Sequence, residues 1–342
     1  MRRAVVLGRT TASIQYRPGD PGARPAAPGP GQLRVRVECS GLANANVMMV
    51  RGEYPGGPRG PWSPGYDVVG TVDAVGAGVE EFAVGERVAV LTKWGGCQQF
   101  LAWPAGKSVV KVPAGCEDSA KAVSVVLNGV TALQMLERTA GLEAGQTALV
   151  HGLAGGMGSM LALLCRAKSI RVIGTASAGK HEVCRRLGAE PLDYNNEDWS
   201  ARVLALTEGR GVDAVFDSVG GDYVAKSLRC LKKSGTYVNY GLNASSPQHG
   251  GRLGGVLTTA AGFAAGLLKA ALFVGPRVRT YFIGLTYSDA KIKEDLARLL
   301  DMLAAGELDP PIHRVYPLER CREAMEAIEQ HAAVGKVVVD LR

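Results

Sequence analysis

Apolar and polar residues alternate strictly from Leu33 to Cys39. A period of two is typical of a strand that buries one face. Apolar runs at 68–75 and 87–91 predict two further strands, with glycines between them. Two segments rich in proline and glycine, 18–31 and 55–65, predict loops, because proline cannot donate to a sheet ladder and glycine weakens one. The first third of the chain is therefore expected to be β-structure with long loops.

From about residue 125 the pattern changes to short apolar runs separated by segments with helical spacing. Repeated β-α units of this length predict a parallel sheet with helices on both faces. The expected strands are 147–151, 171–175, 214–217 and 236–240, and the expected helices are 159–168, 180–187 and 223–231. The last part of the chain predicts helices over 291–306 and 318–331 and a strand over 336–341. The predicted fold class is α/β.

One apolar stretch, 253–275, stands apart from this alternation. Its uncharged part, 253–268, is 16 residues long, which is shorter than the ~20 needed to span a bilayer. A buried or cleft-lining helix is the favoured interpretation. Attachment to a membrane surface is the alternative.

Composition indicates a folded, two-domain protein. The chain has 342 residues, of which 46% are hydrophobic and 21% charged. The net charge of +7 is scattered, without a block of like charges, which argues against a nucleic-acid tail and is compatible with a phosphorylated small ligand. The seven cysteines form no CxxC pair, and only four apolar residues follow the basic start. Reduced thiols and a cytoplasmic location are expected.

The segment from His151 to Ser159 carries the strongest local motif. Its glycines are spaced GxxGxxG at the turn from a predicted strand into a predicted helix. Glycine allows a tight turn, and a helix N-terminus offers free N–H groups to a diphosphate. No lysine follows, so the motif is not a Walker P-loop. Gly155, Gly156, Met157 and Gly158 are the predicted phosphate contacts, whereas His151 is expected to be a hydrogen-bonded core residue.

The end of the next predicted strand bears on the choice of cofactor. An NAD site usually has Asp or Glu there to bind the ribose 2′-hydroxyl. The segment 174–180 has none, and Ser177 and Lys180 offer a hydroxyl and a cation instead, which suits a 2′-phosphate. Tyr194, expected near the end of the following strand, is a third donor. The sequence thus favours NADPH, although Lys180 at the start of a solvated helix is the simpler alternative.

The chain resembles the medium-chain dehydrogenase/reductase superfamily, in its zinc-free quinone oxidoreductase and enoyl reductase branch. The likeness runs over nearly the whole chain. It is carried by Pro64–Gly70, the glycine turn, Thr175–Ser177 with Lys180, Phe216–Gly221 and Gly335–Val339. It implies a GroES-like β-rich catalytic domain over 1–124 and 288–342 and a Rossmann domain with a doubly wound parallel sheet over 125–287. Homodimers are common in such proteins and are expected here.

The resemblance also implies where zinc ligands would stand. Zinc-dependent relatives have a cysteine after the glycine that matches Gly41, and here that place is Ala43. Their His-Glu pair corresponds to Tyr66–Asp67. Of their cluster of four cysteines only Cys97 is present. The five histidines show no ligand spacing, so no metal is expected, and alcohol dehydrogenation without a Lewis acid is disfavoured.

The zinc-free branch reduces polarised C=C bonds or quinones, which requires a proton donor beside the hydride. Enoyl reductases often use a tyrosine in a Tyr-Pro-Gly context, which makes Tyr54 the candidate acid; a loop aromatic packed under a lid is the alternative. Quinone reductases have an asparagine at Ala43, and Asn44 and Asn46 are candidates to replace it. Relatives contact the cofactor at positions that match Asn128, Thr131, Ser218, Val219, Gly241 and Asn243.

Three functions are compatible with these patterns. The leading one is an NADPH-dependent reductase of a small hydrophobic enone or quinone, with a polyketide- or lipid-like substrate. The second is an NADPH-binding protein related to the VAT-1 group that associates with lipid, which the stretch 253–275 favours. The third is a cyclase or lyase on the same fold. Nucleic-acid binding has no basic-aromatic patch to support it.

Overall fold

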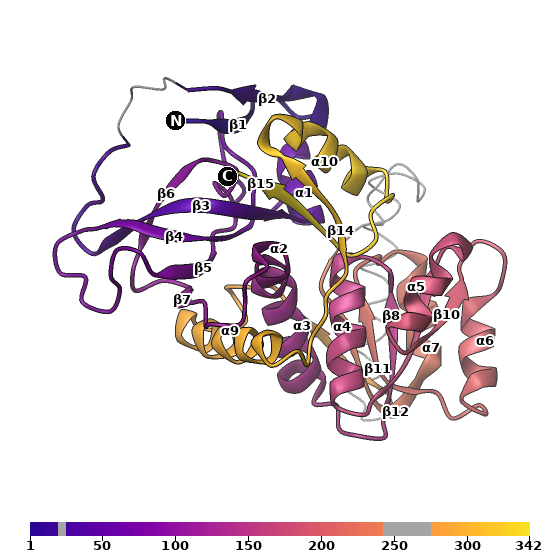
Figure 1. The fold of residues 1–342 in the computed structure, drawn as a ribbon. Helices are drawn as coiled ribbons and strands as arrows, with labels where there is room; N and C mark the ends of the chain where they lie inside the picture. Colours follow the sequence, from indigo (N-terminus) through magenta and orange to yellow (C-terminus); the bar gives the residue numbers. More distant parts are fainter. Residues whose placement is uncertain (20–24, 242–274) are drawn as a thin grey trace. The chain divides into compact units, whose positions relative to one another are not determined.

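The computed structural model describes residues 1–19, 25–241 and 275–342. These residues form two compact units (Figure 1). Met1–Val130 and Tyr287–Arg342 make one, here called the β-rich unit, and Thr131–Thr286 make the other, here called the parallel-sheet unit. Asn243 and most of the apolar stretch, 253–274, lie outside the described residues.

The β-rich unit is built on a seven-stranded sheet and a separate two-stranded ribbon. Its strands are β1 (Arg3–Val6), β2 (Ile14–Arg17), β3 (Gln32–Leu42), β4 (Asp67–Val75), β5 (Arg87–Leu91), β6 (Phe100–Pro104), β7 (Val109–Lys111), β14 (Ile312–Pro317) and β15 (Lys336–Asp340). The order is β14-β15-β3-β4-β5-β7, with β6 also paired to β3. The strand β15 from the far end of the sequence thus lies beside β3, antiparallel to it.

Short helices connect and cover these strands. They are η1 (Thr11–Ser13), α1 (Asn44–Arg51), α2 (Ser119–Ser124), the π-helical η2 (Val125–Gly129), α9 (Asp289–Ala304), η7 (Leu318–Arg320) and α10 (Cys321–Glu329). The helix α10 packs on α1 and on β15. The N- and C-terminal parts of the sequence therefore share one hydrophobic core.

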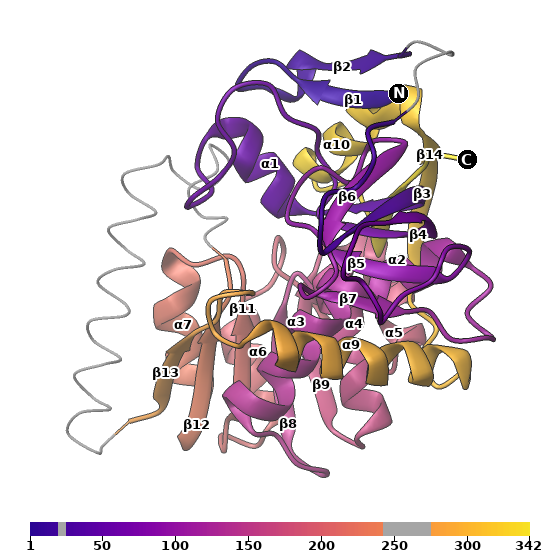
Figure 2. The same ribbon diagram turned by 90° about the vertical axis from the view of Figure 1, so that its left-hand side faces the viewer.

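The described part of the parallel-sheet unit has six strands in the order β10-β9-β8-β11-β12-β13, all parallel (Figure 2). Its strands are β8 (Thr147–His151), β9 (Arg171–Ala176), β10 (Ala189–Asp193), β11 (Val212–Asp217), β12 (Leu231–Asn239) and β13 (Arg277–Thr280). Its helices are α3 (Val130–Leu133), the π-helical η3 (Gln134–Ala140), α4 (Gly156–Ala167), η4 (Ala178–Lys180), α5 (His181–Arg186), α6 (Trp199–Leu206) and α7 (Asp222–Cys230). The order reverses between β8 and β11, as in doubly wound folds, which bind ligands at such a point.

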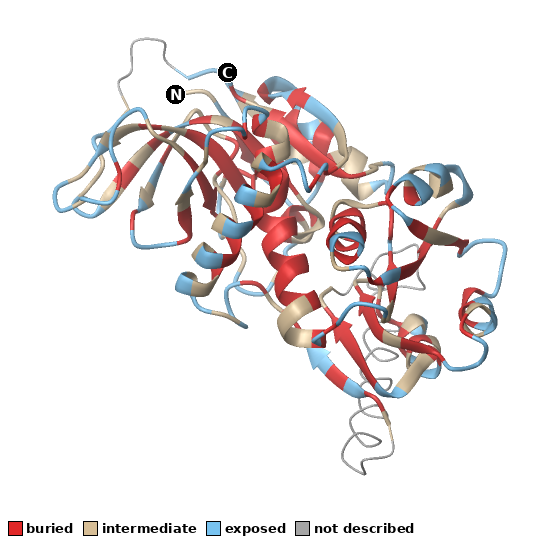
Figure 3. Cartoon of the chain, turned by 60° about the horizontal axis from the view of Figure 1, so that its bottom comes forward, coloured by how far each residue is buried: buried red, intermediate tan, exposed pale blue. Residues whose placement is uncertain are grey.

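Burial follows the predicted pattern (Figure 3). Along β3 the apolar positions of the alternation are buried, and the charged ones between them reach solvent. β5 and β8 begin and end where the sequence predicts them. The strand β10 contains Glu190 and Pro191 and has no clear apolar pattern. It lies at the edge of the sheet, where proline is tolerated.

Among the described residues, one helical segment, Ser119–Ala140, is long and apolar enough to cross a membrane. In the structure 89% of its apolar window is buried inside the protein. This is the environment of a core helix, so the segment's apolar character is explained by packing.

Candidate functional site

The turn between β8 and α4 is the main candidate for a ligand site in the parallel-sheet unit. β8 ends at His151, Gly152 follows with φ of 69°, and α4 begins at Gly156 after an extended Gly155. A positive φ favours glycine, so the chain turns sharply from strand to helix. The first N–H groups of α4 lack acceptors within the helix and lie at the positive end of its dipole, which is the arrangement that binds phosphate.

Close packing fixes the inner side of this turn. A Cβ at Gly158 would overlap Gly152 O and lie 2.6 Å from Leu153 Cα. A Cβ at Gly174, on β9, would lie 2.6 Å from Val150 O. A Cβ at Gly152, in contrast, would meet nothing within 4 Å. The turn is therefore closed toward the sheet and open on its outer side, which fits a diphosphate lying against the backbone.

His151 supports the turn from the sheet side. The ring is fully buried, with Nδ1 3.1 Å from Thr175 Oγ1 and Nε2 2.9 Å from Ser227 Oγ. Burial lowers its pKa, so the imidazole is neutral near pH 7. Thr175 accepts hydrogen bonds from Gly152 N through its hydroxyl and from Leu153 N through its carbonyl, at 3.4 and 3.0 Å. The expectation that His151 is a satisfied core residue is confirmed.

Ser177 and Lys180 stand just beyond the carboxyl end of β9, beside the turn after β8. Ser177 precedes the short helix η4, and Lys180 ends it; both side chains are half-buried. Partial burial lowers the pKa of Lys180. Tyr194 follows β10 and is 42% exposed. The predicted contacts to the adenosine side of a cofactor thus lie at the same edge of the sheet as the glycine turn.

The carboxyl ends of β11 and β12 complete this edge. Buried Asp217 accepts hydrogen bonds from Val219 N at 2.6 Å, from Gly220 N at 3.1 Å and from Tyr237 Oη at 2.5 Å. These bonds fix the backbone of the loop that carries Ser218 and Val219. A Cβ at Gly241, after β12, would lie 3.0 Å from Ser218 O. The two loops, which carry three of the predicted cofactor contacts, are therefore packed against each other.

In the β-rich unit, Tyr54 and Tyr66 form a hydroxyl pair. Their Oη atoms are 2.6 Å apart, and the rings meet edge to face with centroids 6.3 Å apart. Tyr66 is 1% exposed. Burial raises the pKa of Tyr54, and the hydrogen bond with Tyr66 opposes part of that rise. The sequence predicts Tyr54 as a proton donor, but it indicates the partner Tyr66 only as the replacement of a zinc ligand.

Asn44 and Asn46 lie in the first turn of α1. Asn46 is fully buried, and its Oδ1 accepts a hydrogen bond from Ala43 N at 3.1 Å, which caps the helix. Its Nδ2 has no hydrogen-bond partner among the described residues. Asn44 is half-buried. The two amides therefore differ. The oxygen of Asn46 caps the helix, and the side chain of Asn44 is the more accessible to solvent.

A buried ion pair that the sequence did not reveal lies next to Tyr66. Asp67 Oδ2 is 2.8 Å from Lys336 Nζ, and the two side chains are 0% and 2% exposed. The same oxygen accepts Leu127 N at 3.1 Å, in the π-helical η2. A Cβ at Gly41 would overlap both charged groups. Asp67 and Lys336 belong to recognised motifs, but nothing local in either motif indicates that they pair.

Asn128 and Thr131, predicted near the nicotinamide, lie one helical turn apart on the segment from η2 to α3. Asn128 is 4% exposed and Thr131 6% exposed. Thr131 Oγ1 has no hydrogen-bond partner among the described residues. An orphaned buried polar atom is compatible with a contact to a ligand, which is the role the sequence predicts for this segment.

The positions that bind zinc in zinc-dependent relatives carry different side chains in this protein. Ala43 has no donor atom, Tyr66 is engaged with Tyr54, and Cys97 is buried as a free thiol. Within the part of the chain that the structure describes, no group of three or more His, Cys, Asp or Glu side chains is arranged to hold a metal ion.

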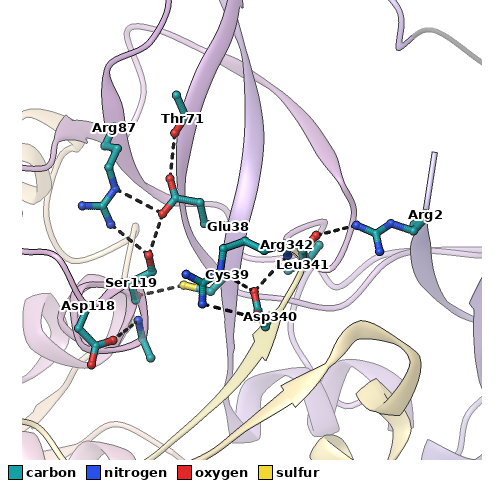
Figure 4. Close-up of polar contacts among 11 residues, drawn as sticks. Arg2, Glu38, Cys39, Thr71, Arg87, Asp118, Ser119, Asp340, Leu341 and Arg342 are labelled. Atoms are coloured by element: carbon teal, nitrogen blue, oxygen red, sulfur yellow. Dashed lines mark hydrogen bonds and ion pairs between the residues drawn. The ribbon is translucent and has the colours of Figure 1, made fainter.

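A separate polar pocket of about 500 Å³ lies in the β-rich unit. Figure 4 shows the polar contacts in and around it. Arg87 donates to Glu38 Oε2, to Ser119 Oγ and to Cys116 O at 2.8–3.3 Å. Arg2 and Arg342, which also line the pocket, donate to Leu341 O and to Asp340. Each of these guanidinium groups has hydrogen-bond partners within the same unit, so the pocket is explained as a structural charge cluster.

Comparison with known proteins gives the family. Residues 29–159 match the alcohol dehydrogenase GroES-like domain, and residues 187–339 match the zinc-binding dehydrogenase family. The chain is 33% identical over 336 residues to the human synaptic vesicle membrane protein VAT-1 homolog, covering 97% of this chain and 84% of that protein. It is 39% identical over 233 residues to a quinone oxidoreductase from Pseudomonas aeruginosa, covering 68% of this chain and 71% of that protein.

Among solved structures, a mycobacterial protein complexed with NADPH superposes with a TM-score of 0.84 at 28% identity, and the match covers 100% of both chains. The chain belongs to the medium-chain dehydrogenase/reductase superfamily, in its quinone oxidoreductase branch.

Proposed function

We propose that this protein is an NADPH-dependent, zinc-independent oxidoreductase that reduces a C=C bond conjugated to a carbonyl group, in a small hydrophobic enone or quinone. The observation that carries the proposal is the carboxyl end of β9. Ser177 and Lys180 stand there, and the segment 174–180 has no carboxylate to bind a free ribose 2′-hydroxyl. The quinone oxidoreductase among the relatives supports the reaction class, and the NADPH-bound structure supports the cofactor.

The residues present fit the dinucleotide. The glycine turn offers backbone N–H groups to a diphosphate, and Lys180 supplies a cation for a 2′-phosphate. Burial lowers the pKa of Lys180, and a phosphate dianion beside the amine would stabilise its charged form. The neutral His151 beneath the turn adds no charge and holds the backbone through Thr175.

NADPH, when bound, supplies a hydride for the β-carbon of the substrate. The protein must then protonate the α-carbon, and Tyr54 is the residue we assign to this step. Its Oη carries the proton and is paired with Tyr66 Oη at 2.6 Å. Asn44 is assigned to orient the substrate carbonyl by donating a hydrogen bond as negative charge develops on the oxygen. No step requires a metal ion, because the developing charge is met by hydrogen-bond donors.

The cofactor assignment is tested with Lys180→Ala. A hydrogen bond to a charged group contributes roughly 1.5–3 kcal/mol, so NADPH affinity should fall at least ~10-fold. NADH affinity should stay within about twofold. Titration of the intrinsic fluorescence of each coenzyme measures both. The matched control is Lys233→Ala, which removes an exposed lysine from β12. Equal losses for NADPH and NADH would refute the 2′-phosphate contact.

The reaction assignment is tested by NADPH oxidation with a panel of enones and quinones. Turnover with at least one class, and none with saturated ketones or alcohols, is the expected result. Prior dialysis against a strong chelator should leave the rate unchanged. Oxidation of alcohols by NADP⁺, or loss of activity on chelation, would contradict the proposal.

A second candidate is an NADPH-binding protein that associates with lipid. The observation that favours it is the 33% identity with the VAT-1 homolog over nearly the whole chain. NADPH binding without turnover on the full panel, together with co-sedimentation with anionic vesicles, would support this candidate over the reductase.

A further inference from the structure

The hydroxyl pair of Tyr54 and Tyr66 joins a residue on a turn to a residue fixed in the sheet. Tyr66 precedes β4, where its N donates to Gly41 O at 3.0 Å and its O accepts Thr92 N at 2.9 Å. The ring is 1% exposed. Both the backbone and the ring of Tyr66 are therefore held in place by the β-rich unit.

Tyr54 reaches this partner through two local signals. The helix α1 ends at Gly52 in the left-handed conformation, and Glu53 N donates back to Met48 O at 2.8 Å, as in a Schellman motif. Tyr54 then begins a four-residue turn in which Gly57 N donates to Tyr54 O at 3.0 Å, with a proline second and Gly56 at φ of 66° third. Tyr54 is therefore held by this turn, and it lies in neither a helix nor a strand.

The two hydroxyls are not equivalent in their surroundings. Tyr66 is fully buried, whereas Tyr54 is only partly buried. A phenol that gives up its proton in a buried place leaves a poorly solvated anion, and burial indeed raises the pKa of Tyr54. A hydrogen bond donated by Tyr66 to the Tyr54 oxygen acts in the opposite direction, because it stabilises the anion.

We propose that Tyr66 is a positioning residue for proton transfer from Tyr54: its hydroxyl donates to Tyr54 Oη, aims the Tyr54 proton away from the pair, and stabilises the oxygen after the proton has left. The inference rests on the proposed function for the identity of the proton acceptor. In the step, the O–H bond of Tyr54 breaks and a C–H bond forms at the substrate α-carbon. The electron pair stays on Tyr54 Oη, and water later returns the proton.

The test compares Tyr66→Phe with Tyr54→Phe and the double variant. Each change keeps the ring and removes one hydroxyl, so the fold should survive, which thermal unfolding checks. Tyr66→Phe should lower kcat on an enone about tenfold or more and leave KM nearly unchanged. The double variant should be no slower than Tyr54→Phe alone, since Tyr66 acts only through Tyr54. Tyr316→Phe, a buried tyrosine on β14 of the same unit, is the control for loss of a hydroxyl.

A pH profile separates positioning from a merely structural contact. A general acid must be protonated, so kcat should fall above the pKa of Tyr54, and Tyr66→Phe should move this alkaline limb to higher pH. A tenfold loss with an unmoved limb would overturn the proposal, as would additive losses in the double variant.

A titration without turnover distinguishes failure of this inference from failure of the proposed function. The near-ultraviolet absorbance of tyrosinate, measured as wild type minus Tyr54→Phe, gives the ionisation of Tyr54. The difference between Tyr66→Phe and the double variant gives the same ionisation without the partner. The second curve should lie at higher pH even if no enone or quinone is reduced. Coincident curves would refute the role of Tyr66 whatever the protein catalyses.

Discussion

The β-rich unit buries a full charge pair, Asp67 with Lys336, whereas the parallel-sheet unit buries a neutral network around His151. The charges lie 2.8 Å apart and are at most 2% exposed. Asp67 Oδ1 has no hydrogen-bond partner among the described residues. In the neutral network both ring nitrogens of His151 are engaged, by Thr175 and Ser227. The charged pair is the stronger interaction, but it leaves one carboxylate oxygen without a partner. The hydrogen bonds of the neutral network are weaker, but they engage both ring nitrogens.

The difference follows from what each network supports. The pair Asp67–Lys336 joins β4, β15 and η2 and thus ties together three distant parts of the sequence. The network of His151 fixes a backbone turn a few residues away, through hydrogen bonds from Gly152 and Leu153 to Thr175. Breaking the ion pair should cost mainly stability, and breaking the His151 network should mainly change the shape of the glycine turn after β8.

The largest effect is expected from Asp67→Asn. Removing one partner of a buried ion pair leaves the other charge uncompensated, which destabilises a protein by about 3–5 kcal/mol. Urea unfolding of the whole chain, followed by far-ultraviolet circular dichroism, measures the loss. Lys336→Met should cost a similar amount.

The double variant Asp67→Asn with Lys336→Met is the control for charge. It leaves no buried charge and should recover a large part of the stability lost in either single variant. Additive losses would mean that the two side chains contribute through packing rather than through their charges, and the contrast between the two networks would disappear.

The sequence anticipates the parallel-sheet unit better than the β-rich one. A glycine turn is encoded within nine residues, and its shape follows from backbone geometry that only glycine permits. The ion pair joins residues 269 positions apart, and the tyrosine pair depends on a turn meeting a strand. Side chains that meet only in the folded protein produce no local sequence pattern. Tyr66 and Lys336 could therefore be recognised as members of motifs, but their partners could not be predicted.

A smaller effect, confined to the parallel-sheet unit, is expected from Gly158→Ala. The added Cβ would overlap Gly152 O and crowd Leu153 Cα, which are backbone atoms and cannot rotate away. Overpacking of this kind costs about 1–3 kcal/mol and displaces α4 from β8. NADPH affinity, measured by calorimetry, should fall at least ~10-fold, as expected for roughly 1.4 kcal/mol or more.

Gly179→Ala is the matched control. It lies in η4 at the same edge of the sheet, and a Cβ there would meet nothing within 4 Å. Its melting temperature should not fall. A Gly158→Ala protein that binds NADPH normally would show that the turn does not hold the diphosphate.

The smallest effect is a pH dependence that belongs to the neutral network. Burial lowers the pKa of His151 from its ordinary value of 6.5, and nearby Asp217 opposes this only in part. Below pH 6.5 the imidazole of the unfolded chain takes up a proton, whereas the buried imidazole of the folded chain stays neutral. The contribution of His151 to stability is therefore complete well above pH 6.5 and is lost as the pH falls.

Wild type should therefore lose more unfolding free energy between about pH 7 and about pH 5 than His151→Gln, which can bond Thr175 and Ser227 without titrating. Urea unfolding at each pH measures the two slopes. Exchange of the exposed His331 for Asn, which tolerates its positive φ of 54°, should leave the wild-type slope intact. Parallel pH curves for wild type and His151→Gln would mean that the buried ring is protonated as easily as a free one, contrary to its burial.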